Sequence, residues 1–563
     1  MTTRVRTAVS ILAAVVLSGL GLGAVPDGSE TVPLTAREKA VHVWNRLGFG
    51  PRPGDVEAVL KMGVRAWIER QLFPERISDG AVQTKLAKLP TLRMSTEDLF
   101  DKFERPLREA RQERKREMAA KGDIGEVDDA DLEKMREKIP PEKRPRRIVE
   151  ELSAARVLRA VYSERQLNEV MVDFWMNHFN VYAAKGLDRI FVTSFEENVV
   201  RPRVWGRFDN LLLATAKSPA MLFYLDNAQS AADENHRPLS PMRSGPRRAL
   251  FAGSGAPAAA KKKMPSGLNE NYARELMELH TLGVEGGYSQ RDVTELARVL
   301  TGWSIDRRGG EPGGFLFRPL LHDIGEKTVL GIRFPAGGGM EEGERAIRIL
   351  AHHPATARHI AAQLCQRLVA DDPPRELVAR VAQRFLATDG DLRETVRAIV
   401  ESREFFDPKY YKAKVKSPFE YAASAVRAAG GETDGALPMV RAIAQMGEPL
   451  YLCQPPTGYS DASSAWVNTG ALVARLNFAL DVAGNKLPGT GIDVESLLSR
   501  TDKDAAGSIQ SLARALTGWD LSDETRDTIA KRLENETNEN APIETRLPLV
   551  AGLILGSPEF QRQ

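Results

Sequence analysis

The stretch LNENYARELMELHTLG, residues 268–283, combines the pattern of a short amphipathic helix with many polar side chains. Ser266 and Asn269 favour an N-terminal cap, and Glu270 places negative charge in the first turn, where the helix dipole favours it. Gly283 predicts the end of the helix. Three leucines at intervals of three residues predict its buried face: Leu276, Leu279 and Leu282.

The neighbouring face of this helix carries the polar groups. Asn271, Glu275 and Glu278 follow one another at offsets that place them on one side of a helix. Arg274 comes four residues before Glu278, at the spacing of an intrahelical ion pair. Two desolvated carboxylates one turn apart can serve as an acid and a base. In the alternative interpretation, Arg274 and other basic groups neutralise both glutamates in a structural network.

A second segment, FWMNHF at residues 174–179, ends an expected helix that begins at Gln166. Leu167, Val170 and Phe174 recur at helical spacing and predict a stripe that faces the core. His178 follows Phe174 by four residues, so its ring is expected near the buried side. A single histidine there is more often a hydrogen-bonded core residue than a ligand, although both interpretations stay open.

Both segments closely resemble the signature motifs of the bacterial domain-of-unknown-function-1800 family, whose activity is not established. The similarity extends to residues 42–50, 226–227 and 322–331. Thr457-Gly458-Tyr459 stands where many members have Gly-Trp after a Pro-Pro pair, which indicates a divergent branch. The resemblance implies export. It also implies an exported protein partner, because members are commonly encoded beside another exported family that looks related to sulfatases.

Residues 1–24 have the layout of a Sec-type signal peptide. Arg4 and Arg6 precede an apolar run at residues 8–17, which becomes Gly-rich before Ala24, the expected cleavage region. The alternative is an uncleaved N-terminal anchor. The run lacks the following cysteine of a lipoprotein and the Arg-Arg pair of the twin-arginine route. We therefore expect a periplasmic or extracellular protein with no membrane span in the mature chain.

Composition argues against nucleic acid as a partner. The 78 Lys and Arg residues nearly balance the 76 Asp and Glu residues, which leaves a net charge of +2. Aromatic residues make up 7% of the chain, too few for a base-stacking surface.

Helical patterns recur along most of the 563 residues, so we expect a mainly α fold with one large multi-helical domain over residues 34–563. Two insertions interrupt the pattern: a charged segment at residues 101–147 and a segment rich in Ala, Gly, Ser and Pro at residues 230–263, expected to be flexible. A small β-hairpin is expected near residues 315–334, with strands at 315–322 and 327–334 around a turn at 323–325.

Motif searches exclude several chemistries. The chain has no Gly-x-Ser-x-Gly elbow and no Cys-x-x-Cys-His haem motif. Its histidines match neither His-Glu-x-x-His nor the Glu-x-x-His pair of di-iron bundles. A divalent transition metal would need a composite site from several segments.

Cys365 is expected as a buried apolar residue, with a Cys365–Cys453 disulfide as the alternative.

Whether the protein is an enzyme stays open at this level. We prefer an extracytoplasmic accessory or binding protein that works with an exported partner. The alternative is a hydrolase-like, metal- or carboxylate-dependent enzyme acting on cell-surface or extracellular material. In that case Glu275, Glu278 and Arg274 are the catalytic candidates, and His178, His280 and His322 are the metal ligands. The binding candidates are Asn269, Asn271, Asn177, Asp226, Asn227 and His42.

Overall fold

The computed structural model describes residues 32–120, 139–233, 267–306, 313–497, 505–536 and 546–563. The predicted signal peptide, the predicted cap residue Ser266 and most of the 230–263 insertion lie outside the described residues.

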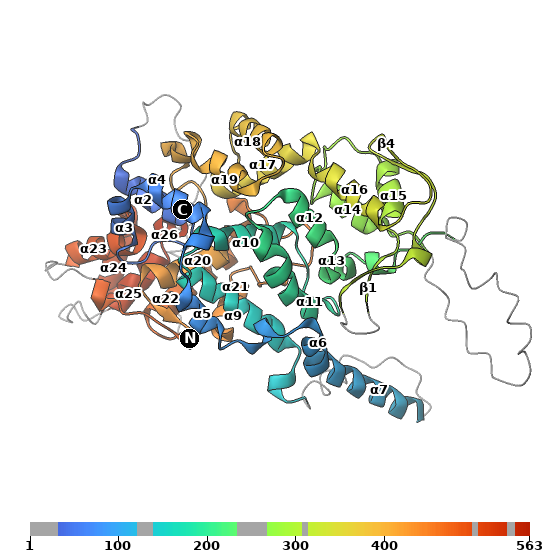
Figure 1. Ribbon diagram of the computed structural model, residues 1–563. Helices are drawn as coiled ribbons and strands as arrows, with labels where there is room; N and C mark the ends of the chain where they lie inside the picture. The colour runs from blue at the N-terminus through green and yellow to red at the C-terminus, as the bar shows by residue number, and fades with distance from the viewer. Residues whose placement is uncertain (1–31, 121–138, 234–266, 307–312, 498–504, 537–545) are drawn as a thin grey trace, which may run out of the picture.

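Helices make up most of the described chain (Figure 1). The first part contains α2 (Ala36–Arg46), α3 (Asp55–Met62), α4 (Val64–Leu72), α5 (Gly80–Leu86), α6 (Thr96–Leu99) and α7 (Arg105–Ala120). The middle contains α9 (Arg146–Tyr162), α10 (Gln166–His178), α11 (Asp188–Ser194), α12 (Phe208–Ala216), α13 (Pro219–Tyr224), α14 (Glu270–Glu278) and α15 (Gln290–Val299).

The remaining helices complete the fold. They are α16 (Met340–Ala351), α17 (Pro354–Leu368), α18 (Arg375–Ala387), α19 (Leu392–Val400), α20 (Pro418–Ala428), α21 (Leu437–Gln445), α22 (Thr469–Ala483), α23 (Ala505–Thr517), α24 (Asp523–Glu536), α25 (Leu547–Leu555) and α26 (Pro558–Gln561). The expected mainly α fold is confirmed.

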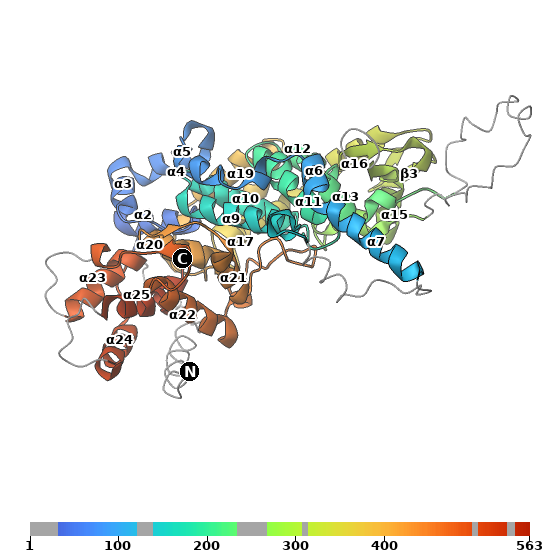
Figure 2. The ribbon, with the colours of Figure 1, turned by 90° about the horizontal axis from the view of Figure 1, so that it is seen from below.

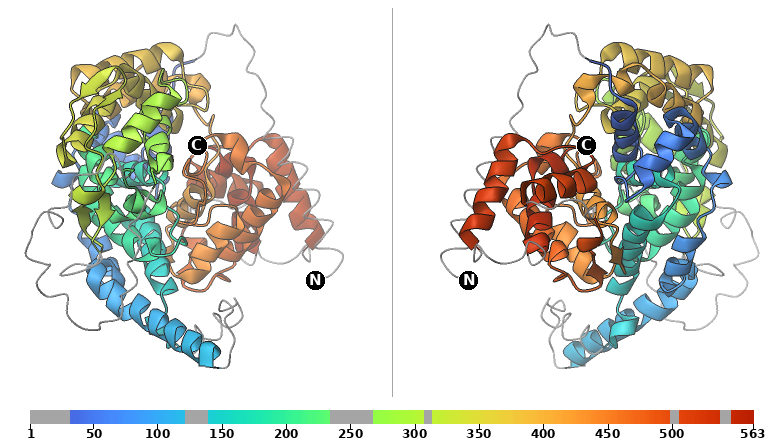
Figure 3. Two further views of the ribbon diagram at one scale, coloured as in Figure 1. Left: turned by 90° about the vertical axis from the view of Figure 1, so that its right-hand side faces the viewer. Right: turned by 90° about the vertical axis from the view of Figure 1, so that its left-hand side faces the viewer.

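Helices α9 and α10 occupy the middle of the molecule. The end with α14, α15 and α16 lies on one side of them, and α22 to α26 lie on the other (Figure 1). Seen from below and from the two ends, α22 to α25 stand beside the rest of the chain (Figures 2 and 3). Helix α9 contacts α10, α11, α20 and α21, so it joins the first half of the chain to the second.

Among the described residues, one large hydrophobic cluster contains buried side chains from Ala40 in the first helices to Phe560 near the C-terminus. The predicted α10 stripe is confirmed, since Leu167, Val170 and Phe174 are all buried. Burying one such side chain stabilises the fold by about 1.5–3 kcal/mol. The core therefore holds together segments that are hundreds of residues apart in sequence.

A small β-hairpin is present within residues 315–334, as expected, but its strands are not the expected ones. Among the described residues, β1 (Trp303–Ile305) pairs with β2 (Phe315–Phe317), β3 (Lys327–Val329) with β4 (Ile332–Phe334), and β5 (Glu432–Thr433) with β6 (Thr490–Gly491). The expected pairing of 315–322 with 327–334 is wrong. Pro319 cannot donate to a ladder and starts a short 3-10 turn at Pro319–Leu321. Leu330 and Gly331, at φ 51° and 75°, form the tight turn that joins β3 to β4.

Helix α14 begins as expected and ends early. The Asn269 side chain accepts a hydrogen bond from the Asn271 N–H, which confirms this residue as the cap. The α-helix stops at Glu278, and the chain continues in turns to Gly283, whose φ is 79°. Leu276 and Leu282 of the predicted leucine stripe are buried and Leu279 is partly buried. Within the helix, Tyr272, Ala273 and Met277 are buried as well.

The described part of the charged insertion contains α7, which projects from the body of the molecule (Figure 1). Of its 16 residues, Leu107 is the buried one. This agrees with the expected solvated helix. Across the described residues, none of the helices combines the length and the apolar character needed to cross a membrane.

Candidate functional site

The predicted catalytic pair lies on the partly buried face of α14. Burial raises the pKa of Glu275, and the neighbouring Glu278 raises it further. The Tyr288 hydroxyl donates to Glu278 at 3.3 Å. Arg274 is directed elsewhere, since it donates to Gln290 at 2.8 Å and lies 3.7 Å from Glu270. The expected Arg274–Glu278 ion pair is therefore replaced by contacts with α15 and the first turn of α14.

Two of the predicted metal ligands lie together in the core. The rings of His178 and His280 are 6.0 Å apart, and His359 of α17, absent from the prediction, lies 6.4 Å from His178. His178 Nε2 is 3.3 Å from the His280 carbonyl oxygen, and His359 Nε2 is 3.1 Å from the Leu279 carbonyl oxygen. His178 is thus a buried core histidine. Burial lowers the pKa of all three rings, that of His280 to about 3.

The third predicted ligand, His322, has a different set of neighbours. Its Nδ1 lies 2.8 Å from the Thr301 carbonyl oxygen, and its Nε2 lies 3.3 Å from Glu342, which also pairs with buried Lys327 at 2.6 Å. The structure does not bring His322 together with His178 and His280. Within the described ranges, no group of three or more His, Cys, Asp or Glu side chains is arranged to hold a metal ion.

Most of the predicted binding residues hold backbone segments in place. Asn227 is fully buried and donates to the carbonyls of Leu300 and Trp303, at 3.2 and 3.3 Å. Asn269 donates to the Leu225 carbonyl at 2.9 Å. His42 lies 2.8 Å from the Phe405 carbonyl oxygen, and burial lowers its pKa to about 3.

Two further predicted binding residues, Asp226 and Asn271, face solvent. Asp226 has a φ of 60°, and its carboxylate accepts from Lys185 at 2.9 Å. Asn271 lies exposed in the first turn of α14. Neither side chain lines a cavity that is described below.

Asn177 fixes the loop that carries the divergent Thr-Gly-Tyr sequence. Its amide donates to the Tyr459 carbonyl at 2.8 Å and accepts from the Tyr459 N–H at 2.7 Å. Gly458, at φ 69°, packs so closely that an added Cβ would lie 2.4 Å from the Asn177 carbonyl oxygen. Glycine is therefore required at this close approach.

Sequence reasoning missed a buried charged centre beneath this loop, composed of Arg156, Asp173, Arg367, Glu420 and Asp461. Asp173 pairs with both arginines. Arg367 also reaches Glu420 at 2.9 Å and Asp461 at 3.3 Å. The cavity at this centre has a volume of about 20 Å³, which suits about one water molecule and no larger ligand.

A second cavity, which we call the groove, has a volume of about 490 Å³. One wall is the α9 face that carries Val149 and Ser153, and the other is the α21 face that carries Leu437, Val440 and Ala444. This volume falls in the range of about 300–1,000 Å³ that is common for ligand sites.

Further apolar residues and four arginines complete the groove. Pro449, Leu450 and Leu452 contribute from the segment after α21, and the Leu452 side chain is 40% exposed. Among the described residues, four arginines and one glutamate line the groove: Arg144, Arg146, Arg189, Arg441 and Glu150. An apolar floor with a positive edge suits a ligand that is both apolar and acidic.

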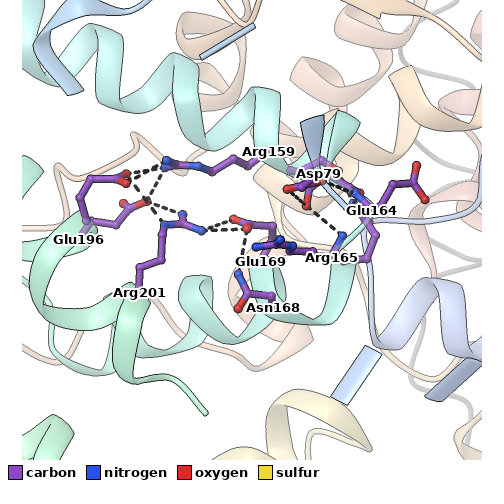
Figure 4. A network of polar contacts seen from close by, with 12 residues as sticks. Asp79, Arg159, Glu164, Arg165, Asn168, Glu169, Glu196 and Arg201 are labelled. Carbon is purple, nitrogen blue, oxygen red and sulfur yellow. Dashed lines mark hydrogen bonds and ion pairs between the residues drawn. The ribbon is translucent and has the colours of Figure 1, made fainter. Parts of the chain in front are cut away.

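The wall at residues 449–452 is held by buried ion pairs. Arg159 and Arg201 both reach Glu196, at 3.3 and 2.8 Å, and Arg201 also binds Glu169 at 2.8 Å (Figure 4). Burial disfavours the Glu196 charge, but the two arginines outweigh burial and keep the pKa of this carboxyl below its ordinary value. The Tyr451 hydroxyl donates to the same carboxylate at 2.5 Å.

Tyr451 is fixed from its backbone as well. Its φ is 61°, and its carbonyl accepts from the N–H of Ala183, which itself lines the groove, at 3.0 Å. The groove is consequently preformed, because its wall is part of the buried network. No sequence pattern pointed to it, since its walls come from segments about 290 residues apart in sequence.

Both cysteines are free thiols and both are buried. The expectation of Cys365 as a buried core residue is confirmed, and the alternative Cys365–Cys453 disulfide is not formed. Burial raises the pKa of both thiols, to about 12 for Cys365 and about 11 for Cys453.

Comparison with known proteins gives one match. No curated protein and no solved structure matches the chain. The family model described as protein of unknown function (DUF1800) matches residues 42–562, a range that includes both signature segments, the charged centre and the groove. The chain therefore belongs to the DUF1800 family.

Proposed function

We propose that this chain is an exported binding protein that serves as an accessory to an exported partner, and that the groove is its binding surface. The observation that carries the proposal is a preformed apolar cavity of about 490 Å³ with four arginines in its lining. Ligand sites are usually concave, mainly apolar and supplied with a few placed polar groups.

The signature residues support an architectural use of the polar motifs. The side-chain amides of Asn177, Asn227 and Asn269 each donate a hydrogen bond to a backbone carbonyl. The charged centre is satisfied internally and has space for about one water molecule. Neither arrangement offers a substrate-sized space, whereas the groove does.

The sequence at the N-terminus supports export. Arg4 and Arg6 precede the apolar run at residues 8–17, in the order of a Sec-type signal. On this proposal the protein acts in the periplasm or outside the cell, where an exported partner is available.

A dye titration tests the groove. Protein recovered from the extracytoplasmic fraction is titrated with the anionic aromatic dye anilinonaphthalene sulfonate, and recovery in that fraction tests export. Val440→Glu places a carboxylate among the apolar groove residues and should weaken dye binding by at least about tenfold. Val284→Glu is the matched control, because Val284 is 74% exposed on a different surface. Equal dye affinity in both variants would refute the groove as a binding site.

A further inference from the structure

We propose that the occupant of the groove is an acidic amphipathic helix of the exported partner. This inference rests on the proposed function and adds the chemistry of the partner. The geometry that supports it is a groove between two helices with positive side chains in its lining.

Both walls present a single helical face. The α9 lining residues are Arg146, Val149, Glu150 and Ser153, and the α21 lining residues are Leu437, Val440, Arg441 and Ala444. Each set follows the spacing i, i+3, i+4, i+7, so each helix offers one continuous strip. Helix α21 buries a second side, with Met439 and Ile443, against the core.

The floor permits a close approach. Ser153, Ala183 and Ala444 are small, so a third helix could pack at an ordinary interaxial distance of about 8–10 Å. Leu452, 40% exposed, offers an apolar contact at the edge of the groove. Helix-in-groove recognition uses anchors at i, i+3, i+4 and i+7, the same spacing that the two walls display.

Charge decides the kind of helix. The Nε atoms of Arg144 and Arg189 donate to the backbone carbonyls of Ile139 and Gly186, at 2.9 and 2.8 Å, which fixes both side chains beside the groove. Arg146 lies 3.6 Å from Glu150, which is the acidic side chain among the described lining residues. Arg441 is exposed on α21. Asp and Glu side chains on an entering helix would meet this excess of guanidinium groups.

A peptide selection tests the inference. A phage library of random peptides of roughly 15 residues, about four helical turns, is selected on the full chain and depleted on the Val440→Glu variant. We expect the enriched peptides to carry apolar residues at i, i+3, i+4 and i+7 and a net negative charge. Circular dichroism should show them gaining helix on binding.

Charge reversal provides the decisive comparison. Arg441→Glu should weaken the selected peptides by about tenfold or more, and a Glu→Lys change in the peptide should restore binding to that variant. Arg291→Glu, an exposed position on α15, is the matched control and should leave binding unchanged. Peptides that are basic, that lack helical spacing or that ignore Arg441→Glu would overturn the inference.

The outcomes separate the two proposals. If dye binding is weakened by Val440→Glu but the selection yields no peptide that needs the groove, the proposed function stands and the acidic helix is refuted. Dye affinity that is unchanged in Val440→Glu, together with no peptide left after depletion on that variant, would refute both. Peptide binding that appears only after residues 121–138 are deleted would make the chain's own insertion the occupant and would also refute a partner helix.

Discussion

At the residue scale, burial favours the neutral ring of four histidines. Burial lowers the pKa of His42, His178, His280 and His359 because a charged ring would lose its hydration. His280 Nε2 has no hydrogen-bond partner among the described residues, so nothing there favours its charged form. These rings are better suited to packing and backbone contacts than to proton transfer near neutral pH.

The pKa of His280 makes stability depend on pH. Its value in the folded protein is about 3, against 6.5 for an unperturbed ring. Between these values the unfolded chain binds a proton that the folded chain excludes, so stability is full above the unfolded pKa and falls as the pH decreases. When the pH is lowered from about 7 to about 5, the unfolding free energy of the unsubstituted protein should fall by about 2 kcal/mol more than that of His280→Gln.

Urea denaturation at the two pH values measures this difference. His352→Gln is the comparison, since that ring is partly exposed and lies 2.8 Å from Asp389. If His280→Gln keeps the full acid sensitivity of the unsubstituted protein, the ring does not exclude a proton in the folded state.

At the element scale, the C-terminal half of α10 serves three parts of the molecule. Asp173 enters the charged centre, Asn177 clamps the loop at Tyr459, and His178 lies in the histidine cluster. Positions 173 and 177 lie one turn apart on the same face of the helix, and position 178 lies on a neighbouring face, which explains how a short polar motif can join several segments.

Removal of the clamp should loosen the loop and leave the helix intact. Asn177→Ala deletes two hydrogen bonds to the Tyr459 backbone, and the expected cost is about 1–3 kcal/mol. Hydrogen exchange should accelerate at residues 455–461 without a change in α10. Asn271→Ala, an exposed asparagine on α14, is the matched control and should stay within about 0.5 kcal/mol. Unchanged exchange in Asn177→Ala would show that other contacts hold the loop.

Elements with strong local signals were predictable. The Asn269 cap of α14 and the stripe of α10 both rest on neighbours within one helix, so the sequence predicts them well. The prediction of the strand pairing was wrong because the partner of Phe317 is Trp303, which lies before the expected hairpin in the sequence. Short strands have little local signal to specify a partner.

At the scale of the whole molecule, the C-terminus is built into the core. The Tyr421 hydroxyl donates to the Leu555 carbonyl at 2.9 Å, and Lys416 donates to the Phe560 carbonyl at 2.8 Å. Gln563 and Lys414 exchange backbone hydrogen bonds. The last helices therefore complete the packing of α20 rather than forming a separate unit.

Deletion of residues 547–563 should abolish the cooperative fold. The segment contains six large buried apolar side chains: Leu547, Val550, Leu553, Ile554, Leu555 and Phe560. Their loss removes roughly 10 kcal/mol of burial, comparable with the whole stability of about 5–15 kcal/mol of a typical protein. Calorimetry of the truncated chain should show no unfolding peak. A sharp peak near the temperature of the full chain would show that the C-terminal helices are dispensable.

The sequence by itself determined the helical class, the family and the polar motifs, because helix periodicity, capping and signature spacing are local properties. Only the tertiary structure decided what those motifs do. It placed His322 away from His178 and His280, turned Arg274 toward Gln290, and joined Arg367 to Asp173 and Asp461. It also formed the groove between Val149 and Val440, since a cavity exists only where distant segments pack around it.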